Sequence, residues 1–299
     1  MEITSRIVEI AAWGVSLATH SKNYGSYQDE LIKLITPDNI MSVKSIEKNY
    51  KNATPSGVVV ETKDYILVSF RGTELVNLWE VFHDSQLHRR RVKFGKESHL
   101  IHSGFITEYE ESKESLKKAL SETSPDKPII FSGHSLGGAM ANIAALDFAT
   151  NKVMGDREVG GVITFGAPRV LSHRAASLYT RLGLSEKSVR VVQKGDPIPE
   201  LAPFSLFKHT GKEVLINEPK GPIHTSRAYR KIAGRIQPHH IEGARMVDRF
   251  ERYLAKILTM VRDKILLFVG SISQKEYGMR ERIRKEREFK EMFPMHKKS

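Results

Sequence analysis

The residues best suited to chemistry lie in segment 133–137, which reads Gly-His-Ser-Leu-Gly. This G-x-S-x-G spacing is typical of a nucleophile elbow, a tight turn that presents a serine hydroxyl for attack on a carbonyl carbon. The glycines are needed because the serine backbone is strained and a helix must pass close to a strand. The motif therefore predicts Ser135 as the nucleophile of an acyl-transfer reaction.

A serine nucleophile needs an imidazole to take its proton and a carboxylate to fix the imidazole tautomer. In chains with this elbow the order is Ser, then Asp or Glu, then His. Asp196 follows an apolar strand, in the loop position where such a fold presents its acid, and we expect it to be that carboxylate. The histidines that follow it, and that are candidates for the base, are His209, His224, His239 and His240.

The transition state of acyl transfer carries negative charge on the former carbonyl oxygen, so hydrogen-bond donors must surround that atom. The residue after the nucleophile supplies one donor through its backbone N–H, which here belongs to Leu136. His134 precedes the nucleophile, and we expect it to pack or hydrogen-bond behind the elbow.

Alternating strands and helices are expected around this motif. An apolar run over 128–132 predicts a short buried strand, and the alanine-rich segment 136–150 predicts a helix. Further strands are expected at 57–62, 65–71, 159–167 and 188–194, and further helices at 104–121 and 175–182. Strands alternating with helices imply a mostly parallel sheet covered on both faces. The sequence thus predicts an α/β fold of the α/β-hydrolase type.

The first twenty residues are expected to form an amphipathic helix of the mature protein. Glu2, Arg6 and Glu9 interrupt its apolar residues at helical spacing, whereas a signal peptide needs an uninterrupted apolar centre. No segment reaches the roughly 18 apolar residues of a membrane span. These features favour a cytoplasmic or peripheral-membrane location and leave non-classical secretion open. Residues 24–50 are mixed and polar, and helices are expected there.

Positive charge is concentrated at the C-terminus. The net charge of the 299 residues is +12, and the segment from Arg245 to Ser299 has fifteen Lys or Arg against eight Asp or Glu. An apolar stripe at helical spacing runs from Val247 to Phe268. We expect residues 1–260 to form the hydrolase domain and residues 261–299 a basic helical extension. The chain has no cysteine, which excludes disulfides and thiolate metal sites.

Six short segments follow one another in a recognisable order. They are 70–73 (Phe-Arg-Gly-Thr), 101–105 (Ile-His-Ser-Gly-Phe), 133–138 (Gly-His-Ser-Leu-Gly-Gly), 164–169 (Thr-Phe-Gly-Ala-Pro-Arg), 195–199 (Gly-Asp-Pro-Ile-Pro) and 208–214 (Lys-His-Thr-Gly-Lys-Glu-Val). Together they resemble the signature segments of the fungal-type lipase family, lipase class 3, over roughly Gly57 to Leu254. The resemblance implies a carboxylic ester hydrolase, like a triacylglycerol lipase or phospholipase A1, that acts on lipid esters through an acyl-enzyme.

The resemblance also implies two site residues. In the family the histidine precedes a C-terminal helix and is commonly followed by apolar residues two and five positions on. His239 fits this pattern through Ile241 and Ala244, and His240 is the alternative. By the same resemblance, Thr73 supplies the second oxyanion donor through its backbone N–H and hydroxyl.

The segment after Thr73 departs from the apolar lid of the secreted lipases. It contains a basic loop, Arg89–Lys96, which together with the C-terminal tail suggests contact with an anionic membrane surface. Nucleic acid is disfavoured because aromatic residues do not interleave with the basic ones. No cofactor motif is present. The His99–His102 spacing lacks a nearby carboxylate or cysteine set, so no metal is expected either.

Two other classes of function remain as alternatives. The chain could be a catalytically silent lipase-fold scaffold for protein interactions, or a membrane-surface module whose esterase activity is secondary. Silent scaffolds usually lose a member of the catalytic set, whereas Ser135, Asp196, Thr73 and candidate histidines are all present here. The sequence therefore favours the enzyme.

Overall fold

The computed structural model describes residues 1–19, 40–48, 55–72, 89–202, 205–217 and 224–244. All of them belong to one compact unit, Met1–Asp248. Thr73, the apolar stripe 247–268 and the predicted boundary at residue 260 lie outside the described residues. Within the described part of the chain, no helix has both the length and the apolar character needed to cross a membrane.

A seven-stranded sheet forms the centre of the unit, in the order β1-β2-β3-β6-β8-β10-β12. Its strands are β1 (Ile40–Ile46), β2 (Gly57–Thr62), β3 (Ile66–Phe70), β6 (Ile129–His134), β8 (Val159–Phe165), β10 (Ser188–Gln193) and β12 (Lys212–Ile216). Strands β3, β6, β8, β10 and β12 are mutually parallel, and β1 and β2 add an antiparallel edge. The predicted α/β-hydrolase architecture with a mostly parallel sheet is thereby confirmed.

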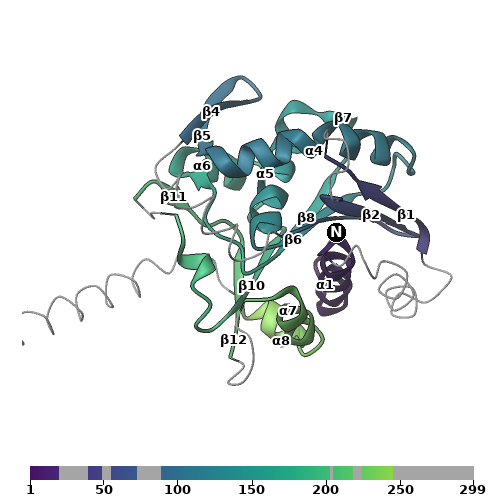
Figure 1. Cartoon of the computed structure of the whole chain (residues 1–299), viewed down its shortest axis with the longest axis vertical. Coiled ribbons are helices and arrows are strands. Elements are labelled where there is room, and N and C mark those ends of the chain that lie inside the picture. Colours follow the sequence, from purple (N-terminus) through teal and green to yellow (C-terminus); the bar gives the residue numbers. More distant parts are fainter. Residues whose placement is uncertain (20–39, 49–54, 73–88, 203–204, 218–223, 245–299) are drawn as a thin grey trace, which may run out of the picture. The chain divides into compact units, whose positions relative to one another are not determined.

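Helices cover both faces of this sheet (Figure 1). Helices α4 (Ser103–Ser121) and α5 (Leu136–Asn151) lie on one face, and α1 (Ser5–Thr19), α7 (Ser226–Ala233) and α8 (Pro238–Glu242) lie on the other. Outside the sheets, the described residues also form β7 (Val153–Asp156), α6 (His173–Arg181) and the 3-10 turn η3 (Ile198–Glu200).

The strand that leads to the serine shows how the two layers are built. Ile129 and Phe131 of β6 pack into the core beneath α4 and α5, while Ile130 packs into the core beneath α1. Successive side chains of a strand point to opposite faces, so a strand with two covered faces needs apolar residues at every position. The continuous apolar run before Ser135 is therefore a direct consequence of burial on both sides.

A second, smaller sheet has the order β11-β9-β5-β4. Its strands are β4 (Arg89–Phe94), β5 (Glu97–His102), β9 (Leu171–Ser172) and β11 (Phe207–Lys208). The prediction that Arg89–Lys96 forms a loop is wrong, because β4 and β5 pair as an antiparallel hairpin. An arginine-rich strand is compatible with the edge of a sheet, where charged side chains face water and Phe94 is buried.

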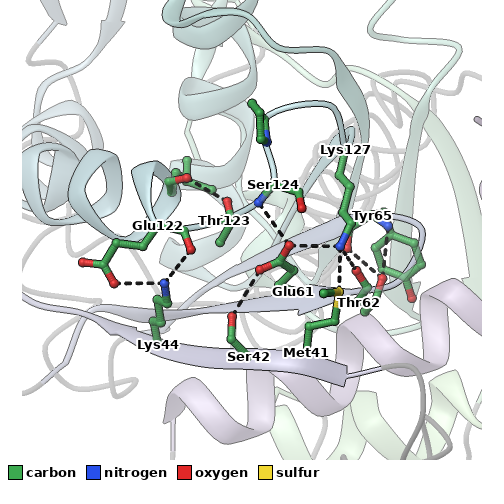
Figure 2. Close-up of polar contacts among 12 residues, drawn as sticks. Met41, Ser42, Lys44, Glu61, Thr62, Tyr65, Glu122, Thr123, Ser124 and Lys127 are labelled. Atoms are coloured by element: carbon green, nitrogen blue, oxygen red, sulfur yellow. Dashed lines mark hydrogen bonds and ion pairs between the residues drawn. The ribbon is translucent and has the colours of Figure 1, made fainter.

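The expectation of helices throughout residues 24–50 is also wrong for Ile40–Ile46, which form the edge strand β1. Tertiary contacts hold this edge in place (Figure 2). Lys127 Nζ lies 2.9 Å from the Glu61 carboxylate on β2, and the Ser124 N–H donates to the same oxygen at 3.1 Å. Burial raises the pKa of Glu61, but these donors outweigh it and lower the pKa overall. Lys44 of β1 binds Glu122 beyond α4 at 2.9 Å.

Candidate active site

The elbow around Ser135 is a strained turn between β6 and α5. Ser135 has φ 57° and ψ −125°, a conformation that costs a non-glycine residue about 1–3 kcal/mol. Its backbone N–H donates to the Phe165 carbonyl oxygen at 2.9 Å, which ties the turn to β8. The strain persists because the strand before the turn and the helix after it are both fully packed. Such strain is common where a reactive side chain must be presented in one orientation.

Close backbone packing explains the glycines of the motif. A Cβ atom on Gly133 would lie 2.2 Å from the backbone of Gly137, and a Cβ atom on Gly137 would lie 2.4 Å from the Phe70 carbonyl oxygen. Larger residues would push α5 away from β6 and β3. The glycine spacing thus sets the distance between the start of the helix and the ends of two parallel strands.

The segment that follows β3 also reaches the elbow. A Cβ atom on Gly72 would lie 2.8 Å from the His134 carbonyl oxygen. Leu136 begins α5, and the first amides of a helix have no partner within the helix. The Leu136 N–H is therefore free of intrahelical bonding at the position predicted for an oxyanion donor. Thr73, the predicted second donor, follows Gly72 and lies outside the described residues.

Asp196 lies in the turn after β10 and accepts three hydrogen bonds. Its Oδ1 atom accepts from the Ile198 N–H at 2.9 Å, and its Oδ2 atom accepts from the Tyr229 hydroxyl at 2.5 Å. The third donor is His224, whose Nδ1 atom lies 2.7 Å from Oδ2. The Asp196 residue is only 2% exposed. The buried carboxylate therefore holds the Nδ1 edge of the His224 imidazole ring.

The structure brings His224, and neither His239 nor His240, to Asp196. His239 and His240 lie on α8, where the His240 Nδ1 atom accepts the Gln237 N–H at 2.9 Å and so caps the helix. His209, another candidate, places its Nε2 atom 2.8 Å from the Pro199 carbonyl oxygen. The histidine that contacts Asp196 is therefore neither His239, which the sequence pattern favoured, nor its alternative His240.

The position of His224 explains why the sequence pattern favoured other residues. His224 does precede a helix, since Thr225 caps α7 by accepting the Ala228 N–H at 3.1 Å. However, the residue two positions after His224 is Ser226 rather than an apolar one. The informative signal was the cap followed by the buried, helically spaced Tyr229 and Ile232.

The other ring nitrogen of His224 remains available for proton transfer. His224 Nε2 and Ser135 Oγ are both buried, and neither has a hydrogen-bond partner among the described residues. Because Nδ1 faces the Asp196 carboxylate, the neutral ring carries its proton there and exposes a lone pair at Nε2. In proteins without a bound substrate such serine–histidine hydrogen bonds are often long or absent.

His134 packs directly against His224. Their ring centroids lie 4.5 Å apart with an interplanar angle of 33°. Burial, and then the neighbouring His224 ring, hold the pKa of His134 well below its usual range. His134 is therefore neutral at neutral pH, so it adds no positive charge beside the ring that must take up a proton.

Tyr229 is a site residue that the sequence analysis did not identify. Its hydroxyl donates to Asp196 and accepts the Gln193 N–H at 3.1 Å. Gly166 leaves room for this arrangement, since a Cβ atom there would lie 2.8 Å from both the Asp196 Oδ2 and the tyrosine oxygen. Tyr229 therefore fixes the orientation of the carboxylate from α7.

Replacing Tyr229 by phenylalanine is expected to lower kcat about tenfold, because a hydrogen bond to a charged acceptor is worth about 1.5 kcal/mol. Steady-state hydrolysis of a chromogenic ester measures kcat. Tyr179→Phe is the matched control, since it removes another buried hydroxyl, bonded to Ser188 at 2.8 Å, away from Asp196. If both variants keep the parent kcat and lose only thermal stability, Tyr229 has no role in positioning Asp196.

Neither of the two histidines of β5 joins this set. His99 and His102 are three positions apart in a strand, so their side chains leave it on opposite faces and do not share a ligand. Among the described residues, no group of three or more His, Asp or Glu could hold a metal ion.

Comparison with known proteins finds lipases among the chains that are similar to this one. The family model for Lipase (class 3) matches residues 67–206. Secreted mono- and diacylglycerol lipase 1 of Fusarium solani is 32% identical over 127 residues, which are 41% of this chain and 35% of that protein. Phospholipase A1-Igamma2, chloroplastic, of Arabidopsis thaliana is 28% identical over 153 residues, 41% of this chain and 28% of that protein.

A solved structure gives a similar result. Lipase II from Rhizopus niveus superimposes with a TM-score of 0.55 and 25% identity, covering 72% of this chain and 80% of that one. The chain spans about a third of the length of the curated lipases that it matches first. The fold and the elbow around Ser135 together define an α/β-hydrolase. Over residues 67–206 the chain is similar to the class 3 lipase family.

Proposed function

We propose that this chain is a serine lipase or esterase that hydrolyses acyl ester bonds of a lipid, either an acylglycerol or a phospholipid. The observation that carries the proposal is the buried Asp196–His224 pair beside a strained serine elbow. A buried carboxylate that orients a histidine has a clear use next to a nucleophile. The same pair would be an expensive way to stabilise a fold, because burying a charge costs free energy.

In the proposed mechanism, Ser135 Oγ attacks the ester carbonyl carbon while His224 Nε2 takes the hydroxyl proton. Asp196 Oδ2 accepts the Nδ1–H of His224, which keeps Nε2 basic and stabilises the imidazolium that forms. The developing oxyanion receives the Leu136 N–H and, in this proposal, the N–H and hydroxyl of Thr73.

Collapse of the tetrahedral intermediate breaks the ester C–O bond and leaves an acyl-enzyme on Ser135. His224 returns its proton to the departing alcohol. Water then attacks the acyl-enzyme, with His224 again acting as the base, and releases the fatty acid together with the free serine. Formation and hydrolysis of the acyl-enzyme use the same groups, so no further proton donor is required.

The names of two similar proteins support a lipid ester as the substrate. A mono- and diacylglycerol lipase and a phospholipase A1 are both among the proteins that match this chain. We extend the proposal to an anionic membrane surface, which the β4–β5 hairpin and the C-terminal tail would contact. Support comes from the charges: Arg89, Arg91 and Lys93 are exposed on one face of β4.

A panel of esters tests the proposed function. We expect one preparation to hydrolyse a short-chain nitrophenyl ester, a long-chain nitrophenyl ester and an anionic phospholipid, with the long-chain and phospholipid rates exceeding those of the Ser135→Ala protein. Equal rates in parent and variant for all three substrates would contradict an enzyme and favour a silent scaffold. Cleavage of the short ester alone would contradict the lipid class.

A further inference from the structure

A basic pocket of about 310 Å³ opens on the four-stranded sheet. Three arginines line it, Arg89 and Arg91 from β4 and Arg174 from the start of α6, together with the hydroxyl-bearing Ser98, Ser172 and Ser205. None of the described residues that line this pocket is Asp or Glu. The described lining of the pocket therefore combines positive charge with hydrogen-bond donors.

Strand geometry directs two of these arginines to one side. Side chains alternate along β4, so Arg89 and Arg91 share a face and Arg90 lies on the other. Arg91 pairs with Leu100 across the hairpin, and both residues line the pocket. The run of three arginines is thereby divided between two different environments.

Ion pairing differs between those environments. Arg90 forms an ion pair with Glu110 of α4. In the described part of the chain, no carboxylate lies within ion-pair distance of Arg89 or Arg91. The Glu97 carboxylate lies 3.3 Å from Arg174, but it also lies 3.2 Å from Arg181 and 3.7 Å from His99 Nε2, so one negative charge is shared among three side chains. The pocket is left with an excess of positive charge.

We propose that this pocket binds a phosphate group. Arginine presents a planar fork of donors that matches two phosphate oxygens, and a concave site lined by one sign of charge concentrates ions of the other. A volume of about 310 Å³ is at the lower end of the range for small-molecule sites and accommodates a phosphorylated headgroup. The phosphate belongs either to an anionic phospholipid or to a soluble phosphate ester.

This inference deepens the membrane-surface part of the proposed function and is independent of the hydrolytic part. It assigns the contact to a defined pocket and to a defined chemical group. The test is therefore a binding measurement on full-length protein carrying Ser135→Ala, so that no lipid is consumed. A negative result would leave the hydrolysis proposal intact, and an inactive enzyme would leave the binding proposal intact.

The test compares three variants in the Ser135→Ala background. Arg89→Gln with Arg91→Gln removes both guanidinium groups, and Arg89→Lys with Arg91→Lys keeps the charge but removes the fork. Lys63→Gln with Lys118→Gln is the control, because it removes the same charge from two exposed lysines that do not line the pocket. Calorimetry measures binding of inorganic phosphate and glycerol phosphate. Co-sedimentation measures binding to phosphatidylcholine vesicles with and without phosphatidic acid.

We expect the Arg89→Gln, Arg91→Gln pair to weaken the affinity about thirtyfold. The lysine pair should weaken it less, and the control pair should change it little. If the glutamine pair loses binding in both assays, the pocket accepts phosphate from either source. If it loses binding only to vesicles, the source is the lipid headgroup. The C-terminal tail is present in every variant, so its contribution is common to all. Equal binding by the glutamine pair and its parent, equal loss in the control pair, or no binding by the parent would overturn the proposal.

Discussion

Replacing Ser135 by alanine is expected to lower turnover by roughly a millionfold, the size of loss seen when the triad serine of a comparable hydrolase is removed. The fold should remain intact for two reasons. Alanine keeps the Cβ atom and thus the same backbone strain, and Ser135 Oγ has no hydrogen-bond partner among the described residues to leave unpaired. Hydrolysis rates and thermal unfolding midpoints measure the two effects.

A fluorophosphonate probe gives a direct test of the nucleophile. The parent protein should be labelled at Ser135, and Ser135→Ala should not be labelled. Ser177→Ala is a suitable control, since it removes an exposed serine hydroxyl that donates to the His173 carbonyl oxygen at 2.9 Å. Equal labelling of the parent and the Ser135→Ala protein would rule out Ser135 as the nucleophile.

Replacing His224 by alanine is expected to cause a loss of turnover of similar size, because Ser135 then has no base to take its proton. The proposal rests on the 2.7 Å contact between His224 Nδ1 and Asp196 Oδ2. Single-turnover ester hydrolysis, followed as acylation of the serine, measures the step that needs this base.

His239→Ala and His240→Ala are the decisive controls for that result. Both residues lie on α8, so each variant should keep turnover close to that of the parent. His240→Ala should cost some thermal stability through loss of the helix cap that His240 Nδ1 provides. An inactive His239→Ala protein beside an active His224→Ala protein would restore the expectation drawn from the sequence.

Much of the fold could be predicted because its signals are local. The strand before Ser135, the helix after it and the alternation of strands and helices follow from apolar periodicity and from glycine, and the structure places them at Ile129–His134 and Leu136–Asn151. The two errors concern edges. Residues 40–46 and 89–94 carry many polar side chains, and they are strands because neighbouring strands supply their hydrogen bonds.

The candidate site divides in the same way. The sequence by itself determined the elbow, since Ser135 and its glycines are adjacent in the chain and the constraint between them is steric. It also indicated Asp196, which follows directly from the end of a strand. Only the tertiary structure decided between four histidines, because the chosen ring is defined by its contact with a residue 28 positions away. Tyr229, 33 positions from Asp196, entered the site for the same reason: α7 packs against α1 and β10, and this packing brings the Tyr229 hydroxyl to the buried carboxylate.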